Sequence, residues 1–139
     1  MIVTSVNIGR AIQTLINGRL VSTAIAKRGV TGPVEVRPLG LAGDEQADLS
    51  VHGGLSKAVY AYPAAHYAFW QRVRAQAQVS LWEDPLPPGA LGENLTIDGL
   101  DESQLWIGDR LLLPNCTLAV SEPRMPCFKL GIRLGKADA

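Results

Sequence analysis

The sequence lacks an excess of charge of one sign, a long apolar run and more than two cysteines. Its 13 basic and 13 acidic residues leave no net charge, which argues against a dedicated nucleic-acid-binding protein. No run of about 18 apolar residues occurs, so we expect no transmembrane helix. The N-terminus does not combine a basic segment with an apolar stretch and therefore predicts no signal peptide. We expect a cytoplasmic protein in which Cys116 and Cys127 are thiols.

Several sequence motifs that identify common enzyme classes are also missing. The two cysteines and two histidines are widely spaced and contain no CxxC pair, which argues against a zinc finger. The sequence has no GxGxxG, no P-loop, no HExxH and no GxSxG. Dinucleotide binding, nucleotide hydrolysis, zinc-protease chemistry and α/β-hydrolase chemistry therefore lose their usual support.

The composition is that of a folded chain. Apolar residues make up 47% and charged residues 19% of the 139 positions, which is typical of a soluble globular protein. At this length we expect a single domain over residues 1–139, with a core that needs no disulfide or zinc ion. The 14 glycines and nine prolines predict many turns.

Short apolar segments separated by turn residues predict a mainly β, barrel-like architecture with few helices. Strands are expected at residues 1–9, 57–62, 95–97, 105–113 and 117–121, with two extended segments within 18–37. One helix is expected over 63–78, because Pro63 suits a first helical turn and His66, Trp70, Val73 and Ala77 fall on one helical face. Residues 41–48 and 83–92 are expected to form loops, and 122–135 a mixed segment.

Cys127 lies in the most informative segment of the chain, Ser-Glu-Pro-Arg-Met-Pro-Cys-Phe-Lys-Leu. Two prolines stiffen the backbone on either side of Arg124, and Lys129 follows the cysteine by two residues. Cationic neighbours favour the thiolate, which can act as a nucleophile or bind a soft metal. The alternative is a small buried apolar residue without reactivity.

His52 precedes a Gly-Gly pair, where the backbone can pass close to a ligand. It could donate a proton or a hydrogen bond, or it could simply bond the local backbone of the turn. Cys116 has no cationic neighbour within five residues and is expected to be a packing residue. We also expect His66 to pack in the core or at an interface.

The segment Gly-Glu-Asn-Leu places Glu93 and Asn94 between a proline-rich loop and a strand. Such a pair can present a carboxylate, an amide and backbone N–H groups to a polar ligand. It can equally serve the turn itself, because asparagine tolerates left-handed backbone conformations. Asp48 and Lys57 bracket the His52 turn, and either could be a plain surface charge.

Five blocks together resemble the MOSC domain, named after the C-terminus of molybdenum cofactor sulfurase. The likeness covers about Val3 to Leu130 and is greatest to stand-alone bacterial proteins linked to detoxification of N-hydroxylated purine bases. The blocks are Asp48–Gly54, Lys57–Pro63, Gly92–Leu95, Trp106–Asp109 and Glu122–Leu130.

The resemblance implies a β-rich, barrel-like fold and a molybdenum cofactor, and it does not imply pyridoxal phosphate. The family cysteine, which ligates molybdenum held by a pterin in related reductases, aligns with Cys127. His52, Glu93 and Asn94 are then expected to line the same pocket. Cationic groups suit phosphate. Arg124 and Lys129 are therefore candidates for the pterin phosphate, and Lys57 joins the cofactor-binding candidates.

Three functions remain open on this sequence. The first is a molybdenum-dependent reductase of N-hydroxylated compounds, in which Cys127 ligates the metal and His52 takes part in catalysis. It would need an external electron-donor protein, since the chain has no flavin, haem or iron–sulfur motif. The second is a non-catalytic carrier of sulfur or of the cofactor. The third is a hydrolase with Cys127 as nucleophile and His52 as base.

The resemblance also implies a domain that continues beyond residue 139. We therefore expect a MOSC domain shortened at its C-terminus relative to the family, with an exposed sheet edge that a partner chain would cover. A homodimer is one such arrangement. Small-molecule substrate and electron donor are the other expected partners, with no nucleic acid and no membrane.

Overall fold

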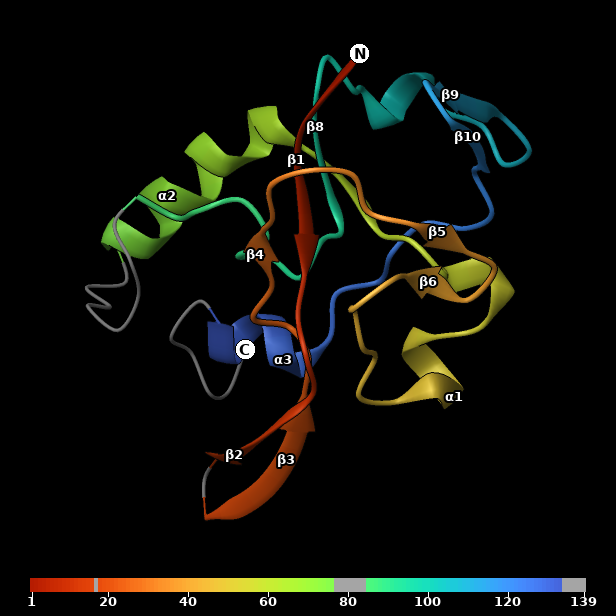
Figure 1. Ribbon diagram of the computed structural model, residues 1–139. Helices are drawn as coiled ribbons and strands as arrows, with labels where there is room; N and C mark the ends of the chain where they lie inside the picture. Colours follow the sequence, from red (N-terminus) through yellow and green to blue (C-terminus); the bar gives the residue numbers. More distant parts are fainter. Residues whose placement is uncertain (17, 77–84, 134–139) are drawn as a thin grey trace.

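The computed structural model describes residues 1–16, 18–76 and 85–133 of the chain. These residues contain ten strands, three α-helices and three short 3₁₀ helices, so the prediction of a mainly β fold is confirmed (Figure 1). None of the described helices is long and apolar enough to cross a membrane. The prediction of a single domain remains a prediction.

A four-stranded sheet forms the centre, in the order β4-β1-β8-β7 (Figure 1). Strand β1 (Ile2–Ile8) pairs antiparallel with β4 (Arg28–Gly29) and β8 (Leu95–Asp98), while β7 (Ala61–Pro63) runs parallel to β8. Strand β8 lies between β1 and β7 and is buried over its first three residues, as expected for a central strand. The buried apolar side chains come from this strand and the turn before it, and from one distant leucine: Leu41, Leu86, Ala90, Leu91, Leu95 and Ile97.

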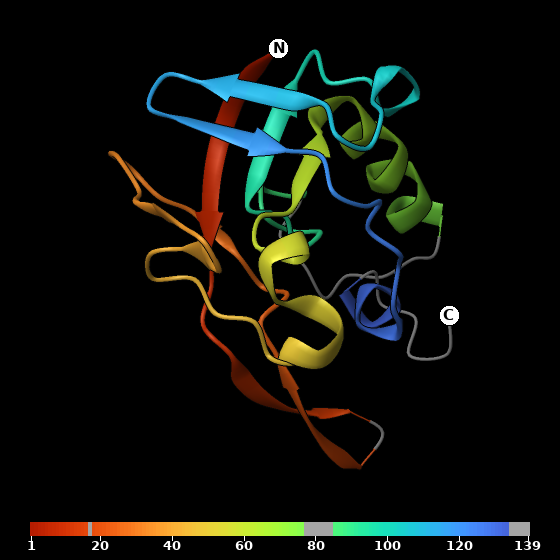
Figure 2. The ribbon, with the colours of Figure 1, turned by 90° about the vertical axis from the view of Figure 1, so that its right-hand side faces the viewer.

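Three antiparallel hairpins surround the central sheet. Strands β2 (Ile12–Ile16) and β3 (Arg19–Thr23) form a hairpin that projects from one end of the molecule (Figure 2). Strands β5 (Val36–Arg37) and β6 (Gly40–Leu41) form the second, and β9 (Arg110–Leu113) and β10 (Cys116–Ala119) the third. Among the described strands these sheets stay separate and do not close into a barrel.

The structure corrects two boundaries around the predicted helix. Pro63 belongs to β7, with an extended ψ of 126°, and a 3₁₀ turn over Ala64–His66 precedes α2 (Tyr67–Gln76). Proline suits a strand end as well as a helix start, so the pattern could not separate the two. The predicted strand over 57–62 is also too long, because Lys57 ends a 3₁₀ helix over Leu55–Lys57. Ala77 and Gln78 lie outside the described residues.

The remaining helices are short. Helix α1 (Leu49–His52) begins after Asp48, whose carboxylate caps it by accepting a hydrogen bond from the Ser50 backbone. A 3₁₀ turn at Glu102–Gln104 precedes β9, and α3 (Phe128–Arg133) ends the described part of the chain. Both views place α1 and α3 at the same end of the central sheet (Figures 1 and 2).

Candidate functional site

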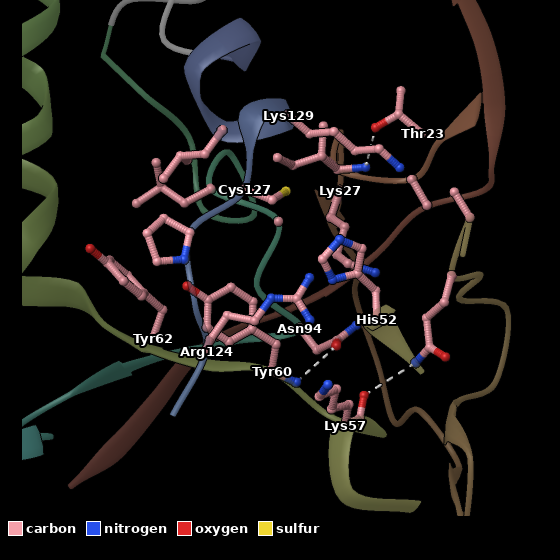
Figure 3. Close-up of a pocket in the computed structure, with 18 of the residues that line it drawn as sticks. Thr23, Lys27, His52, Lys57, Tyr60, Tyr62, Asn94, Arg124, Cys127 and Lys129 are labelled. Atoms are coloured by element: carbon pink, nitrogen blue, oxygen red, sulfur yellow. Dashed lines mark hydrogen bonds between the residues drawn. The ribbon is translucent and has the colours of Figure 1, made fainter. Parts of the chain in front are cut away.

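One cavity of about 280 Å³ brings together residues from distant parts of the sequence (Figure 3). Its lining comes from the segment after β3, from α1, from β7 and α2, from the turn before β8 and from the approach to α3. Ligand pockets commonly measure about 300–1,000 Å³, so this cavity lies just below that range. The lining includes these predicted site residues: His52, Lys57, Asn94, Arg124, Cys127 and Lys129.

Cys127 lies immediately before α3 and is half-buried. Its sulfur points into the cavity (Figure 3), and its carbonyl oxygen accepts a hydrogen bond of 2.9 Å from the Leu130 backbone in the first turn of α3. Both cysteines are free thiols, and Cys116 lies in β10, outside this lining. The structure therefore brings one of the two thiols into the cavity.

Residues 121–130, which we call the outer wall, contribute Arg124, Cys127 and Lys129 to the lining of the cavity. The wall is attached to the body mainly through side chains. Ser121 Oγ donates a hydrogen bond of 2.5 Å to the Ser56 carbonyl, and Ser56 Oγ donates one of 2.8 Å to Glu122. Lys129 Nζ donates to the Ser22 carbonyl at 2.8 Å. Most of the side chains of this wall are exposed.

The positive charges on this side of the cavity are only partly paired. The Arg124 guanidinium lies 5.2 Å from the centre of the Tyr60 ring, a cation–π contact. Within the described ranges it makes no hydrogen bond and no ion pair. Lys57 Nζ donates to the Val51 carbonyl at 3.1 Å and lies 3.8 Å from a Glu122 carboxylate oxygen. Cationic side chains with so few partners in the protein can bind an anionic group without first breaking a strong ion pair.

His52 ends α1 and faces the same space. Partial burial lowers the pKa of His52 below its ordinary value, and the positive charges of Arg124 and Lys129 lower it further. The imidazole is therefore mainly neutral at neutral pH, with one nitrogen able to donate and the other able to accept a hydrogen bond.

Beneath the cavity lies a set of six polar residues that we call the buried network: Asn7, Lys27, Asp44, Glu93, Asn94 and Thr96. Asn94 connects its parts. Its amide nitrogen donates to Asp44 at 2.8 Å and to the Asn7 carbonyl at 3.2 Å, and its amide oxygen accepts from the Tyr60 backbone at 3.1 Å. Asn94 therefore lines the cavity with a side chain whose polar atoms already have partners.

Glu93 belongs to this network and does not line the cavity. Its fully buried carboxylate accepts hydrogen bonds from the backbone of Gly89 at 2.8 Å and of Leu91 at 3.2 Å. It also accepts from the hydroxyl groups of Thr96, at 2.7 Å, and Tyr67. The Glu-Asn pair, which was a candidate ligand-binding unit, is therefore divided: in the turn before β8 the Asn94 side chain lies on the cavity lining, whereas the Glu93 carboxylate is held by the backbone of the turn itself.

Sequence reasoning missed Lys27, which lines the cavity, and its partner Asp44. The two lie 17 positions apart, and no pattern in either segment indicates that they pair. The turn before β8 packs tightly here: a Cβ at Gly89, which has φ of 84°, would lie 2.8 Å from the Lys27 carbonyl oxygen. Only glycine fits both the backbone angle and the space.

Aromatic side chains form another part of the lining that the sequence did not identify. Tyr60 immediately precedes β7, Tyr62 lies within β7, and Trp70 comes from α2. Trp70 Nε1 donates a hydrogen bond of 2.6 Å to the Tyr62 hydroxyl, and burial raises the pKa of both tyrosines. Their period of two was a usable signal, because it places both rings on one face.

The donor set limits the metal chemistry available here. Among the residues that the structure describes, no cluster of three or more histidine, cysteine and carboxylate side chains could hold a metal ion. Cys127 is the cysteine of the lining, and a thiolate prefers soft metals. A metal held at this site would therefore have to arrive with most of its ligands.

The chain is similar to known proteins over nearly its whole length. The family model of the MOSC domain matches residues 48–139. Uncharacterized protein YflK of Bacillus subtilis is 40% identical over 96% of this chain and 57% of its own length. A protein named Reductase from Gibberella moniliformis is 38% identical over 95% of this chain and 22% of its own length. The crystal structure of YiiM from Geobacillus stearothermophilus superposes with a TM-score of 0.69 and 32% identity, over 98% of this chain and 57% of that one. The chain thus spans little more than half the length of YflK and less of the reductase.

Proposed function

The chain belongs to the MOSC domain family, and on that premise we propose that it binds a molybdenum cofactor and reduces N-hydroxylated bases or related compounds. The observation that carries the proposal is the position of Cys127, whose thiol lies in a cavity lined by four side chains of lysine and arginine. The relative named Reductase supports the redox class of the reaction.

The residues of the cavity fit a metal that brings its own ligands. A cofactor in which a pterin holds molybdenum needs few protein ligands, and Cys127 would supply a soft one. No larger cluster of metal-binding side chains occurs in the described part of the chain, which agrees with a metal whose other ligands come from the cofactor. Cys127 is thus assigned to the metal, and Cys116 is not.

The basic side chains fit the phosphate of such a cofactor. Arg124 is an exposed residue of the lining that contacts the Tyr60 ring and has no ion-pair partner in the parts of the chain that are described. Lys129 and Lys57 lie on the same lining. Guanidinium and ammonium groups bind phosphate oxygens through charge-assisted hydrogen bonds. We assign these three residues to cofactor binding, whereas Asn94, whose polar atoms already have partners, would line the site without donating to the phosphate.

The proposed reaction cleaves an N–O bond. It consumes two electrons and two protons and yields the N–H compound and water. When bound, the cofactor would supply the two-electron redox chemistry that the side chains lack, and an external electron-donor protein would replenish it. His52 would hold a proton at one ring nitrogen and donate it, or a hydrogen bond, to the substrate.

An assay with an artificial reductant tests the proposal. The chain is purified from a host that makes the molybdenum cofactor, and reduction of an N-hydroxylated purine base by dithionite-reduced viologen is followed by chromatography of the product. We expect the base without its hydroxyl group as product, a large loss of activity in Cys127→Ser and nearly full activity in Cys116→Ser. Bound molybdenum without any reduction would overturn the reductase and indicate a carrier of the cofactor.

A further inference from the structure

Lys27 combines deep burial with access to the cavity. Its side chain is 7% exposed, yet it belongs to the lining (Figure 3). The ammonium donates a hydrogen bond to Asp44, whose own carboxylate is 2% exposed. Asp44 also accepts from the Gly9 backbone and from the Asn94 side chain, both at 2.8 Å. Asp44 is therefore held in place from three sides, and it fixes the position of the ammonium.

The Lys27 ammonium is not fully satisfied by the protein. It has three N–H donors, and the contact with Asp44 uses one. The described residues offer no partner to the other two donors. Buried donors of a charged group are costly to leave unpaired. These two donors must therefore be matched by water or by a molecule that enters the cavity.

The electrostatic setting makes Lys27 a strong donor. Burial lowers its pKa, the hydrogen bond and charge of Asp44 oppose that change, and the Arg124 guanidinium adds to the lowering. The other cations of the lining differ: Lys57 and Lys129 each donate to a backbone carbonyl and are less buried. Lys27 is thus the deeply buried cation of this site.

We propose that Lys27 is a substrate-binding residue, whose two remaining N–H groups donate to the hydroxyl oxygen of an N-hydroxylated substrate. The proposal rests on the proposed function, because that function names the substrate class. Cys127 lines the same small cavity, so a substrate whose N–O group faces the cysteine lies close to Lys27. The parent base lacks this oxygen, and its binding would leave the two donors unmatched. Lys27 would then distinguish the substrate from the product.

The test compares two ligands against matched variants by isothermal titration calorimetry. The ligands are an N-hydroxylated purine base and the same base without the hydroxyl oxygen. We expect the wild-type protein to bind the hydroxylated base about tenfold to a hundredfold more tightly, as for a hydrogen bond to a charged group. In Lys27→Met that preference should disappear. Lys57→Met, which removes a less buried cation from the same cavity, should keep the preference even where it weakens both ligands.

Two further measurements keep the test decisive where Lys27→Met fails to fold. Lys27→Gln retains an N–H donor toward Asp44 without the charge, and the preference should fall sharply there as well. The wild-type chain has four lysines, so its ¹³C-labelled lysine spectrum is simple. The chemical shift of Lys27 Cε should change when the hydroxylated base is added and should not change when the parent base is added. An unchanged preference in the folded variants, or no preference in the wild type, overturns the proposal. If the binding preference does not depend on Lys27 but the protein still reduces the base, the role of Lys27 is overturned and the proposed function stands. If the preference depends on Lys27 but no reduction occurs, the proposed function is overturned and the role of Lys27 stands.

Discussion

The buried network and the outer wall meet at one cavity but are built in opposite ways. The network consists of side chains that are at most 7% exposed and that are joined by hydrogen bonds to one another and, through Asn7 and Thr96, to strands β1 and β8. The outer wall is mostly exposed and is fastened by a few side-chain contacts to Ser22, Ser56 and Tyr60.

The difference separates stability from ligand binding. A buried polar group that loses its partner costs the full free energy of its desolvation, whereas an exposed group is solvated again by water. Substitutions in the network should therefore lower the free energy of unfolding, and substitutions in the wall should mainly change what the cavity binds. Lys27 and Asn94 belong to the network by burial and to the site by position, and of these two Lys27 carries the charge.

Glu93→Ala should have the largest effect on stability. Removal of the carboxylate leaves the donors of Gly89, Leu91, Thr96 and Tyr67 without their acceptor inside the protein. We expect the free energy of unfolding to fall by about 3 kcal/mol or more, measured by urea denaturation.

Glu122→Ala in the outer wall is the matched control, since its carboxylate is exposed. It loses contacts with Ser56 and Lys57, and we expect a change of at most about 0.5–1 kcal/mol. Equal losses for the two carboxylates would contradict the distinction between network and wall.

Arg124→Ala should weaken cofactor binding strongly and change the stability of the fold only slightly. The guanidinium is exposed and contacts the Tyr60 ring, so the free energy of unfolding should change by less than about 1 kcal/mol. Retention of the molybdenum cofactor through dialysis should fall about tenfold or more, because a charge-assisted contact to phosphate is lost. Arg124→Lys should restore part of it. A variant that unfolds readily but retains the cofactor would place Arg124 with the network instead.

His52 should give the smallest effect, as a difference between two pH values. Its folded-state pKa is lowered, chiefly by burial, so the unfolded chain binds the proton more readily than the folded protein. The contribution to the free energy of unfolding is intact above about pH 6.5, the ordinary pKa of histidine, and is lost as the pH falls toward the folded-state value.

Urea denaturation at pH 7.5 and 5.5 checks this expectation. His52→Gln should lose less stability between the two pH values than the wild type. His66→Gln, which removes a surface histidine that contacts Glu102 at 2.6 Å, serves as the control variant. A wild type that gains stability relative to His52→Gln as the pH falls would contradict the sign of the shift.

The strands and turns were largely predictable from the sequence, because local patterns encode them. The predicted strand at 95–97 is confirmed as β8, and the strand at the N-terminus as β1. The strand boundaries near Lys57 and Pro63 could not be predicted, because a 3₁₀ turn and a strand end leave no distinctive period in the pattern of apolar residues. Closure of the sheets is a long-range property that short segments do not determine.

The candidate site was predictable where one segment carried several signals. Arg124, Cys127 and Lys129 lie close together in the sequence and also meet in the cavity. Lys27 and Asp44 escaped notice because their pairing depends on how β1, β3 and the turn before β8 pack together. Glu93 was expected to line the pocket, but its side chain lies in the interior, where the Gly89 backbone and the Thr96 hydroxyl donate to its carboxylate.

The molybdenum content of two cysteine variants tests the central claim, which is that Cys127 is the metal ligand of this cavity. Wild-type protein and both variants are purified from a host that makes the cofactor, and molybdenum is measured by inductively coupled plasma mass spectrometry. We predict close to one molybdenum per chain in the wild type and in Cys116→Ser, and almost none in Cys127→Ser with unchanged folding. A Cys127→Ser protein that retains its full molybdenum content would contradict the account.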